Sequence, residues 1–536
     1  MNDPAALLAA FRSDAQRRGA GTAYAALLQS LRADLPQPGD WLALAQGLLQ
    51  QGAPGAAVAL AEEGLARHPD LLELRYHLAN ALRMIGERQA AERELRAVLA
   101  MQPQHAGAVA SLAHLLRGEG RLAAAARLAL DALPALPGPQ VLRQTLAFLR
   151  ECDAAHPALE LTQRALMQAP DDGELHAAAG ELALELGRFE QARVHLRRAL
   201  SAQPRFASGW LRLAAAHVFG ARDEPDARLI AQAARELPGD SEAGIAARFA
   251  WSKVLADLGA LDEAVPPLRA ANAALALQRQ WSAQGFAAYV QRQIDQPPPP
   301  PVAQRLPFTP VLIVGLPRTG TTLAARLLAR HPLVRNRGEL NWLAQMALHV
   351  ETGGRRPALL AESAALYAAQ MRRDDGPAQV IVDKNPLNFR QLGMAAALLP
   401  GLRVIHCRRG ARDTALSLYR QMFAHADNDY ACAFADIAAF ARGEARLMAH
   451  WRATLPVPFL TLEYERLVSD TDTVLEELRA FLDLAPAAQA GDGDGAIRTA
   501  SVWQARQRVH REAIGGWRAW APHLPELAEH IPEHWP

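Results

Sequence analysis

The segment VLIVGLPRTGTTLAARLLARHP, residues 311–332, decides the fold of the second half of the chain. Its first four residues are apolar and mostly β-branched, which is typical of a buried parallel strand. A short loop with a glycine at each end follows, and we expect a helix from about Thr321 to Arg330. A strand, a glycine loop and a helix in this order form a P-loop-like phosphate cradle, because backbone N–H groups and the helix N-terminus point at an anion.

The loop differs from that of ordinary nucleotide triphosphatases at one decisive position. The spacing G-x-x-x-x-G is kept between Gly315 and Gly320, but Thr321 stands where the lysine is expected, and Arg318 is the cation inside the loop. ATP- and GTP-hydrolysing enzymes need that lysine on the β- and γ-phosphates. The loop therefore favours a ligand with a single 5′-phosphate carrying a small transferable group, as in 3′-phosphoadenosine 5′-phosphosulfate (PAPS).

A second anion site is predicted in LRVIHCRRGARDTALSLYRQMF, residues 402–423. A short strand, 403–407, leads into an arginine-dense turn, and Ser417 stands on the following helix, eight residues after Arg409. Arginine binds phosphate through two parallel hydrogen bonds, and a serine hydroxyl can complete such a site. The alternative, a solvated basic helix start, is weakened because arginines at a helix N-terminus oppose the helix dipole unless an anion is present.

The first half of the chain repeats with a period of 34 residues. Prolines recur at nearly constant spacing, at Pro69, Pro103, Pro137, Pro170, Pro204 and Pro238. A glycine stands 17 residues before four of them, at Gly52, Gly86, Gly120 and Gly187, and an alanine follows each glycine by five, at Ala57, Ala91, Ala125 and Ala192. These positions predict two antiparallel helices per unit, with a glycine turn, a close approach at the alanine and a proline that ends the second helix.

This pattern resembles the tetratricopeptide repeat over roughly residues 40–240, with a departure around Cys152, where ECDAAHP lacks the turn glycine. Stacked repeats imply a curved all-α solenoid with a concave face. That face binds a peptide or protein, or the array only supports or dimerises the next domain; the sequence leaves both open. We predict a helical cap at 1–40, repeats at 41–240, capping or connecting helices at 241–295, a proline-rich linker at 296–307 and an α/β domain at 308–536.

Composition excludes several classes of protein. The 57 basic and 56 acidic residues nearly cancel, which argues against a whole-chain nucleic-acid binder. The three cysteines form neither a disulfide framework nor a metal-binding spacing. The N-terminus lacks the layout of a secretion signal, and no apolar run is long enough to span a membrane, so we expect a cytoplasmic protein. The chain has two lysines, Lys253 and Lys384, in an otherwise arginine-based set of cations.

The motifs GLPRTGTT, RRGARDTALS and LTLEYERLVSD together resemble the sulfotransferase superfamily over about residues 308–525. The likeness is greatest to the protein-tyrosine sulfotransferases and to bacterial proteins that join tetratricopeptide repeats to a sulfotransferase domain. It implies an α/β P-loop-like domain with a small parallel sheet and helices on both faces. It also implies PAPS as co-substrate, transfer of SO₃ to an acceptor hydroxyl, and no metal.

The resemblance assigns the catalytic residues. Glu339, in the GEL segment, matches the glutamate that acts as general base in the tyrosine-type enzymes. Lys384, in VIVDKNP, matches the lysine–proline turn of the family, and with Arg318 it would stabilise charge on the leaving phosphate. Histidine is the base in cytosolic small-molecule sulfotransferases, but His406 lies on the wrong strand for that role and His331 is predicted to be a structural cap.

The resemblance also implies the donor-binding residues. The 5′-phosphate would be held by Arg318, Thr319, Gly320, Thr321 and Thr322, the 3′-phosphate by Arg409 and Ser417, and the rest of the donor by Tyr464, Ser501 and Arg518. In the C-terminal segment REAIGGWRAW, Gly516 stands where a lysine is expected, and Arg518 or Arg511 would replace that cation.

Two other classes of function remain open at this point. One is a nucleotide-dependent kinase-like P-loop enzyme, which would show magnesium-dependent ATP turnover. The other is a non-catalytic scaffold in which the repeats bind a partner and the second domain only binds nucleotide. Neither the acceptor nor the oligomeric state follows from the sequence.

Overall fold

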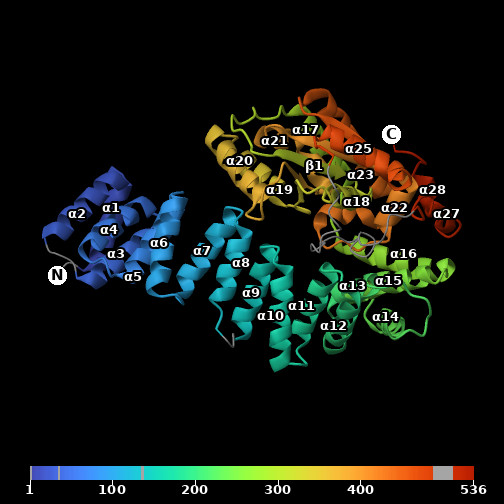
Figure 1. Cartoon of the computed structure of the whole chain (residues 1–536), viewed down its shortest axis with the longest axis horizontal. Coiled ribbons are helices and arrows are strands. Elements are labelled where there is room, and N and C mark those ends of the chain that lie inside the picture. The colour runs from blue at the N-terminus through green and yellow to red at the C-terminus, as the bar shows by residue number, and fades with distance from the viewer. Residues whose placement is uncertain (1–2, 34–36, 135–137, 487–510, 536) are drawn as a thin grey trace. The chain divides into compact units, whose positions relative to one another are not determined.

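A computed structural model describes residues 3–33, 37–134, 138–486 and 511–535 of the chain (Figure 1). Pro137 of the repeat pattern and Ser501 of the predicted donor site lie outside these residues. The chain divides into two compact units, residues 1–152 and 153–536, and the division falls inside the repeats, at Cys152, and not at the proline run. The predicted module boundaries at 40, 240, 295 and 307 stay predictions.

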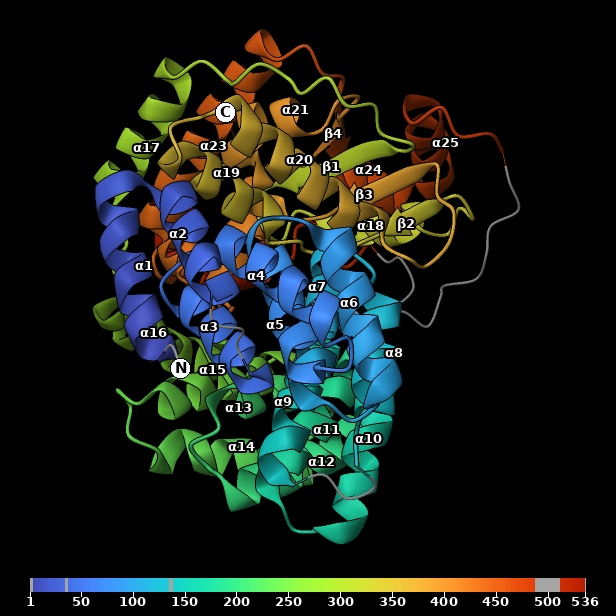
Figure 2. The same cartoon turned by 90° about the vertical axis from the view of Figure 1, so that its left-hand side faces the viewer.

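The described part of the first unit consists of helices that pack as successive antiparallel pairs (Figure 2). They are α1 Pro4–Arg18, α2 Ala20–Ala33, α3 Pro38–Gln50, α4 Pro54–Arg67, α5 Leu72–Met84, α6 Arg88–Met101, α7 Ala106–Gly118, α8 Leu122–Asp131 and α9 Pro139–Glu151. The turn glycines Gly52, Gly86 and Gly120 have φ of 72°, 87° and 74°, a region that favours glycine. The alanines five residues later are at most 1% exposed, as the close approach of two helices requires.

The second unit opens with further helical pairs: α10 Ala155–Gln168, α11 Gly173–Glu185, α12 Phe189–Ala202, α13 Ala207–Ala215, α14 Pro225–Glu236, α15 Glu242–Asp257, α16 Leu261–Gln278 and α17 Ala283–Asp295. In the divergent repeat, Asp153 takes the left-handed turn conformation in place of glycine, with φ of 55°. Aspartate tolerates this region better than most residues do, because its short side chain can bond locally. Beyond residue 240, Gly259 has φ of 74° and Ala264 is fully buried, so the paired-helix geometry continues through α15 and α16.

The C-terminal part of this unit forms around a sheet of five parallel strands in the order β2-β3-β1-β4-β5. The strands are β1 Thr309–Gly315, β2 Val334–Asn336, β3 Val380–Asp383, β4 Arg403–Arg408 and β5 Phe459–Glu463. The connecting elements are α18 Thr321–Leu328, α19 Trp342–Thr352, α20 Pro357–Arg372, η1 Pro386–Gln391, α21 Leu392–Leu398, α22 Ala411–Tyr419, η2 Ala426–Cys432, α23 Phe434–Thr454, α24 Tyr464–Ser469 and α25 Thr471–Phe481. The predicted α/β fold with a small parallel sheet is confirmed.

Alternating residues of β1 enter two hydrophobic cores, one on each face of the sheet. Val311 and Ile313 pack against α18 and α25. Leu312 and Val314 belong to the larger core, which includes residues of α20–α23 and continues into α15–α17. The last helical pair before the proline run therefore shares its core with the sheet domain. No described helix is long and apolar enough to cross a membrane.

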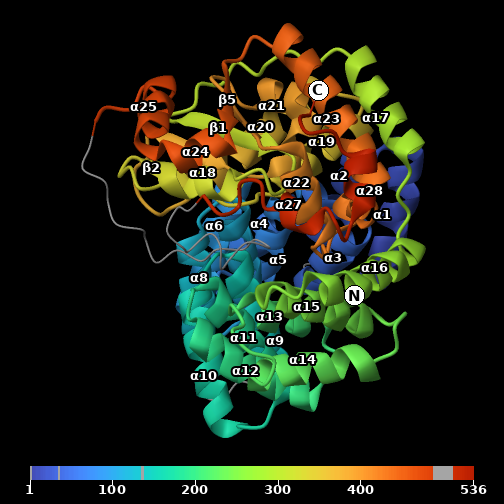
Figure 3. The same cartoon turned by 90° about the vertical axis from the view of Figure 1, so that its right-hand side faces the viewer.

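The last described segment returns to the sheet domain. It contains α27 Trp517–Trp520 and α28 Pro525–His530, which lie beside α22 (Figure 3). The carboxylate of Asp413, on α22, accepts hydrogen bonds from the backbone N–H groups of Gly515 (2.6 Å) and Trp517 (2.9 Å). This arrangement brings residues 511–520 close to the loop that follows β4.

Candidate functional site

The loop between β1 and α18 has the geometry of an anion cradle. Its turn needs positive φ at Arg318 (74°) and Gly320 (89°), and the hydroxyl of Thr319 donates to the carbonyl of Leu316 at 2.7 Å. Gly315 also has to be glycine, because a Cβ there would lie 2.3 Å from the carbonyl oxygen of Cys407. α18 begins at Thr321, as predicted, so Thr321 and Thr322 form the first turn of a helix that points its N–H groups toward this loop.

Three of the predicted donor-binding residues meet at this loop. Arg318 donates from Nε to the hydroxyl of Ser417 at 2.9 Å. Arg409 donates to the carbonyl of Arg318 at 3.1 Å and to that of Ala513 at 2.6 Å. The Nε of Arg409 is buried and has no hydrogen-bond partner within the part of the chain that the structure describes. Residues of the two predicted anion sites, which belong to separate motifs, are therefore in contact with one another.

The electrostatics of this site favour an anion. Burial, with the nearby charge of Arg409, lowers the pKa of Arg318 to about 10. Two guanidinium groups held this close repel each other, and an anion that accepts hydrogen bonds from both would relieve the repulsion. A phosphate is the group that arginine binds with the best geometry.

Tyr464 closes one side of the cradle. It begins α24, and a Cβ on Gly320 would lie 2.6 Å from its ring, so the tyrosine packs directly on the loop. The guanidinium of Arg409 lies 4.7 Å from the centre of the same ring. The structure thus places Tyr464 with Arg318, Gly320 and Arg409.

Glu339 and Lys384 form an ion pair between Nζ and Oε1. Lys384 is 1% exposed, whereas the side chain of Glu339 is 40% exposed, so the carboxylate faces solvent while the ammonium is buried. Hydrogen bonds fix the backbone of both segments, from the N–H of Lys384 to the carbonyl of Gly338 (2.8 Å) and from the amide of Asn385 to the carbonyl of Leu340 (3.2 Å). The proposed base and the proposed cation therefore reach one point from two strand ends.

A buried carboxylate supports this pair and was not predicted. Asp383 accepts hydrogen bonds from the hydroxyl of Tyr367 (2.6 Å), the amide of Asn388 (3.0 Å) and the backbone N–H of Leu340 (3.2 Å). Burial raises the pKa of Asp383 to about 7, against the opposing effect of these donors. The aspartate immediately before Lys384 in VIVDKNP was the signal available in the sequence.

The cations of the C-terminal segment are placed differently. Arg518 is exposed, and its guanidinium lies 5.1 Å from the centre of the neighbouring Trp517 ring. Arg511 donates to the carbonyl of Ser469 at 2.7 Å. Among the described contacts, neither arginine bonds to Ser417, and a role of either in donor binding stays a prediction. The residue that holds this segment is Asp413, which was not predicted as a functional residue although it lies within RRGARDTALS.

The histidines set aside as bases have structural contacts. His406 is buried and its Nε2 lies 2.7 Å from Glu444 Oε1. His331 contacts the carbonyl of Ala485 at 3.0 Å and accepts from the N–H of Leu333 at 3.2 Å, as a cap would. Within the described residues, no cluster of three or more His, Cys, Asp or Glu side chains could hold a metal ion.

Comparison with known proteins finds a family match within each half of the chain. Residues 310–487 match the sulfotransferase family, and residues 38–80 match the tetratricopeptide repeat. An uncharacterized protein of Aquifex aeolicus is 28% identical over 245 residues, covering 42% of this chain and 32% of that protein. The chain thus spans about a third of the length of this curated relative.

Solved structures of both kinds are similar to parts of the chain. The sulfotransferase domain of the Synechococcus PCC 7002 olefin synthase is 18% identical, with a TM-score of 0.30, over 40% of this chain and 90% of that domain. A thermophilic tetratricopeptide-repeat protein of Thermus thermophilus is 24% identical, with a TM-score of 0.21, over 34% of this chain and 98% of that one. The family matches place a sulfotransferase-family domain in the C-terminal half of this chain, preceded by tetratricopeptide repeats.

Proposed function

We propose that the C-terminal domain transfers a sulfuryl group from PAPS to an acceptor hydroxyl. The observation that carries this proposal is the hydrogen bond between Arg318, in the loop after β1, and Ser417, on α22. This bond connects a residue of the predicted 5′-phosphate site to a residue of the predicted 3′-phosphate site. Arg409, also of the 3′-phosphate site, donates to the carbonyl of Arg318 in the same loop. A donor with phosphates at both its 5′ and 3′ positions suits two linked anion sites, whereas ATP carries phosphates at one end only. The match to the sulfotransferase family supports the same reaction class.

The proposed chemistry assigns one task to each side chain. The carboxylate of Glu339 takes the proton of the acceptor hydroxyl as the acceptor oxygen forms a bond to sulfur. The bond between sulfur and the bridging oxygen breaks, and its electron pair stays on the leaving phosphate. Arg318 and the buried ammonium of Lys384 stabilise this charge, and fixed cations in a site with little water do so strongly. The ion pair between Lys384 and Glu339 supports this assignment, because the carboxylate and the ammonium are in contact with each other.

The repeats support a peptide or protein interaction. We propose further that the hydroxyl acceptor is carried by a peptide or protein that the concave face of the repeats binds. A solenoid of paired helices offers an extended surface that suits a chain better than a small metabolite. This part of the proposal is independent of the donor assignment.

Two measurements test the proposal. Calorimetry with adenosine 3′,5′-bisphosphate should show binding, and radiolabelled PAPS with a host lysate should give sulfated peptide or protein. Failure to bind the bisphosphate would overturn the donor assignment. Binding without any sulfated product would favour the scaffold alternative, and magnesium-dependent ATP turnover would favour the kinase-like alternative.

A further inference from the structure

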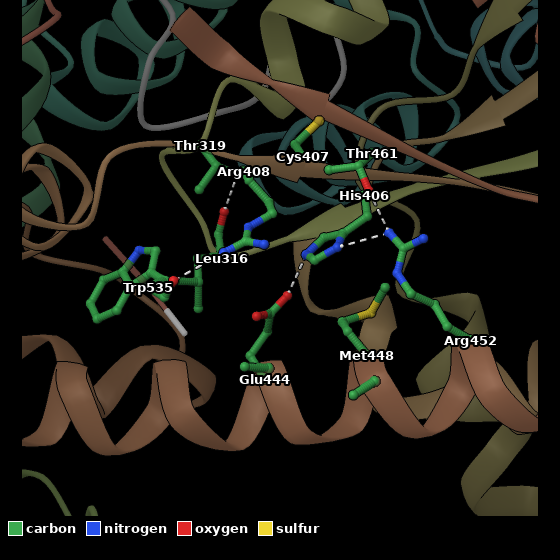
Figure 4. Close-up of a pocket in the computed structure, with 12 residues that line it drawn as sticks. Leu316, Thr319, His406, Cys407, Arg408, Glu444, Met448, Arg452, Thr461 and Trp535 are labelled. Atoms are coloured by element: carbon green, nitrogen blue, oxygen red, sulfur yellow. Dashed lines mark hydrogen bonds and ion pairs between the residues drawn. The ribbon is translucent and has the colours of Figure 1, made fainter. Parts of the chain in front are cut away.

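A pocket lies between α23 and the strands β4 and β5, next to the predicted phosphate loop (Figure 4). Its volume is about 210 Å³, and Leu316 and Thr319 of the loop line one part of it. Of the described residues assigned above to the donor or to the reaction, Thr319 alone is in its lining. The pocket is therefore distinct from the ion pair of Glu339 with Lys384 and from the contacts of Arg318 with Ser417 and Arg409.

The interior of the pocket is charged in an unusual way. His406 and Glu444 are both buried and bond to each other at 2.7 Å, so the carboxylate of the pocket already has a partner. Arg408 and Arg452 lie on either side of this pair (Figure 4). The two guanidinium groups place positive charge on both sides of the pair, which favours an anion.

Arg452 is the better placed of the two cations. Its Nη2 donates to the hydroxyl of Thr461 at 2.7 Å and lies 3.4 Å from Nδ1 of His406, which orients the guanidinium. In the described part of the chain, its Nε and Nη1 make no hydrogen bond, so these donors remain for a ligand. Burial and the nearby charge of Arg408 lower the pKa of Arg452, and a bound anion would offset both effects.

The remaining walls are apolar. Leu316, Ala445, Met448 and Trp535 line the pocket together with the charged groups. A methionine side chain adapts to different apolar shapes, because it is unbranched and flexible. An inorganic ion would leave this apolar surface without contact, whereas an organic body would cover it. Small-molecule pockets commonly combine an apolar lining with a few polar groups that fix orientation.

We propose that this pocket binds a small organic anion, a carboxylate on an apolar body of about the size of benzoate. The carboxylate accepts hydrogen bonds from Arg452, and the body packs between Met448 and Leu316. Because Leu316 also accepts the hydrogen bond from Thr319, the ligand contacts the phosphate loop without filling the donor site. The proposal does not depend on the reaction assigned to the domain.

The test is calorimetry or ligand-observed NMR on the full chain, with benzoate and its neutral analogue benzamide as probes. Benzoate should bind at least about tenfold more tightly than benzamide, because only benzoate can accept a charge-assisted pair of hydrogen bonds. Arg452→Gln should reduce benzoate binding to the level of benzamide. Met448→Trp, which fills the pocket with a larger side chain, should abolish binding of both.

Matched variants separate this pocket from other cations. Arg442→Gln, an exposed position on the same helix outside the lining, should bind benzoate like the native chain. Arg409→Lys, in the donor site, should do the same. Melting temperatures identify any variant that does not fold; if Met448→Trp fails, Arg452→Gln decides. Benzoate binding that survives Arg452→Gln, that is lost with Arg409→Lys, or that is absent from the native chain overturns the proposal.

Discussion

The ammonium of Lys384 contacts the carboxylate of Glu339, a residue 45 positions earlier in the chain. The contact follows from the sheet, because β2 and β3 pair in parallel with Asn336 beside Val382. Two residues further along both strands, Gly338 and Lys384 are joined by a backbone hydrogen bond, and Glu339 is next in line. Each residue was predicted from its own motif, but their pairing depends on the register of two strands.

Replacement of Glu339 by glutamine should abolish turnover and spare donor binding. The amide keeps the size of the side chain and its hydrogen-bonding oxygen but cannot take a proton from the acceptor, which predicts a loss of about 10²–10⁴-fold in kcat. Affinity for adenosine 3′,5′-bisphosphate should not change, since Glu339 is not among the groups at the phosphate loop. Steady-state kinetics and calorimetry measure the two quantities.

A matched control for this variant is Glu476→Gln, on α25, where the side chain is 73% exposed and its contact to Arg479 is loose at 3.9 Å. This change should leave kcat as in the native protein. Full activity of Glu339→Gln would remove Glu339 from the role of base and leave the ion pair with Lys384 as a structural contact.

The two lysines offer a test in which charge is conserved. Lys384→Arg should lower kcat by about 10²–10³-fold, because a planar guanidinium does not fit a site where the ammonium is 1% exposed and cannot reproduce its point charge. Lys253, on α15, contacts Asp257 and the carbonyl of His217, so Lys253→Arg should affect stability and leave kcat unchanged. Assays well below both melting temperatures separate the two effects, and equal losses of kcat would contradict a special role for Lys384.

Arg409→Lys should weaken recognition of a 3′-phosphate specifically. A lysine cannot make two parallel hydrogen bonds, and a hydrogen bond to a charged group contributes about 1.5–3 kcal/mol, which corresponds to about 10- to 150-fold in affinity. The affinity for adenosine 3′,5′-bisphosphate should fall toward that for AMP, whose own affinity should change little. Calorimetry with both nucleotides gives the ratio.

The corresponding control is Arg466→Lys on α24, an exposed arginine whose partner is Glu477, which should leave both affinities unchanged. If Arg409→Lys weakens both nucleotides to the same extent, Arg409 does not distinguish the 3′-phosphate and the two-site interpretation of the cradle fails.

The fold was more predictable than the contacts that complete the site. Turn glycines and buried alanines specify helical pairs locally, and the strand–loop–helix at 311–332 specifies the cradle, because both patterns involve residues close in sequence. Asp413 and Asp383 were not predicted, because they bond to residues that lie far away in the sequence. Asp413 accepts from backbone N–H groups about one hundred residues later, and an acceptor of this kind leaves no motif in the sequence.

The position of the compact division could not be predicted for a related reason. A run of five prolines predicts a stretch without helix, and residues 297–301 contain none. Nothing in that run indicates that the core of the sheet continues into α15–α17. Which helices share a core depends on side chains that meet across long separations, such as Asn272, whose amide donates to the carbonyl of Tyr419.

The buried carboxylate of Asp383 should make stability depend on pH. Its pKa is raised to about 7 in the folded protein, against about 4 in an unfolded chain, because burial disfavours the charged form. Between these values the folded state holds a proton that the unfolded state has lost. The contribution of this group to the free energy of unfolding is therefore fully present below about pH 4 and is lost as the pH rises through about 7.

Denaturant unfolding of the native chain and of Asp383→Asn at pH 5.5 and pH 8 tests this expectation. Asparagine cannot titrate, so the difference in unfolding free energy between the two pH values should shrink by an amount on the order of 2 kcal/mol. At both pH values the variant should be less stable, since its amide nitrogen replaces an oxygen that accepts hydrogen bonds. Asp375→Asn is the control. Burial opposes ionisation of Asp375, but the hydrogen bonds and charge of Arg337 outweigh burial and lower the pKa of this carboxyl. Asp375 is therefore ionised at both pH values, and its replacement should leave the pH dependence of the unfolding free energy unchanged. An Asp383→Asn variant with the native pH dependence would show that Asp383 is ionised in the folded protein throughout this range, held so by its three hydrogen-bond donors.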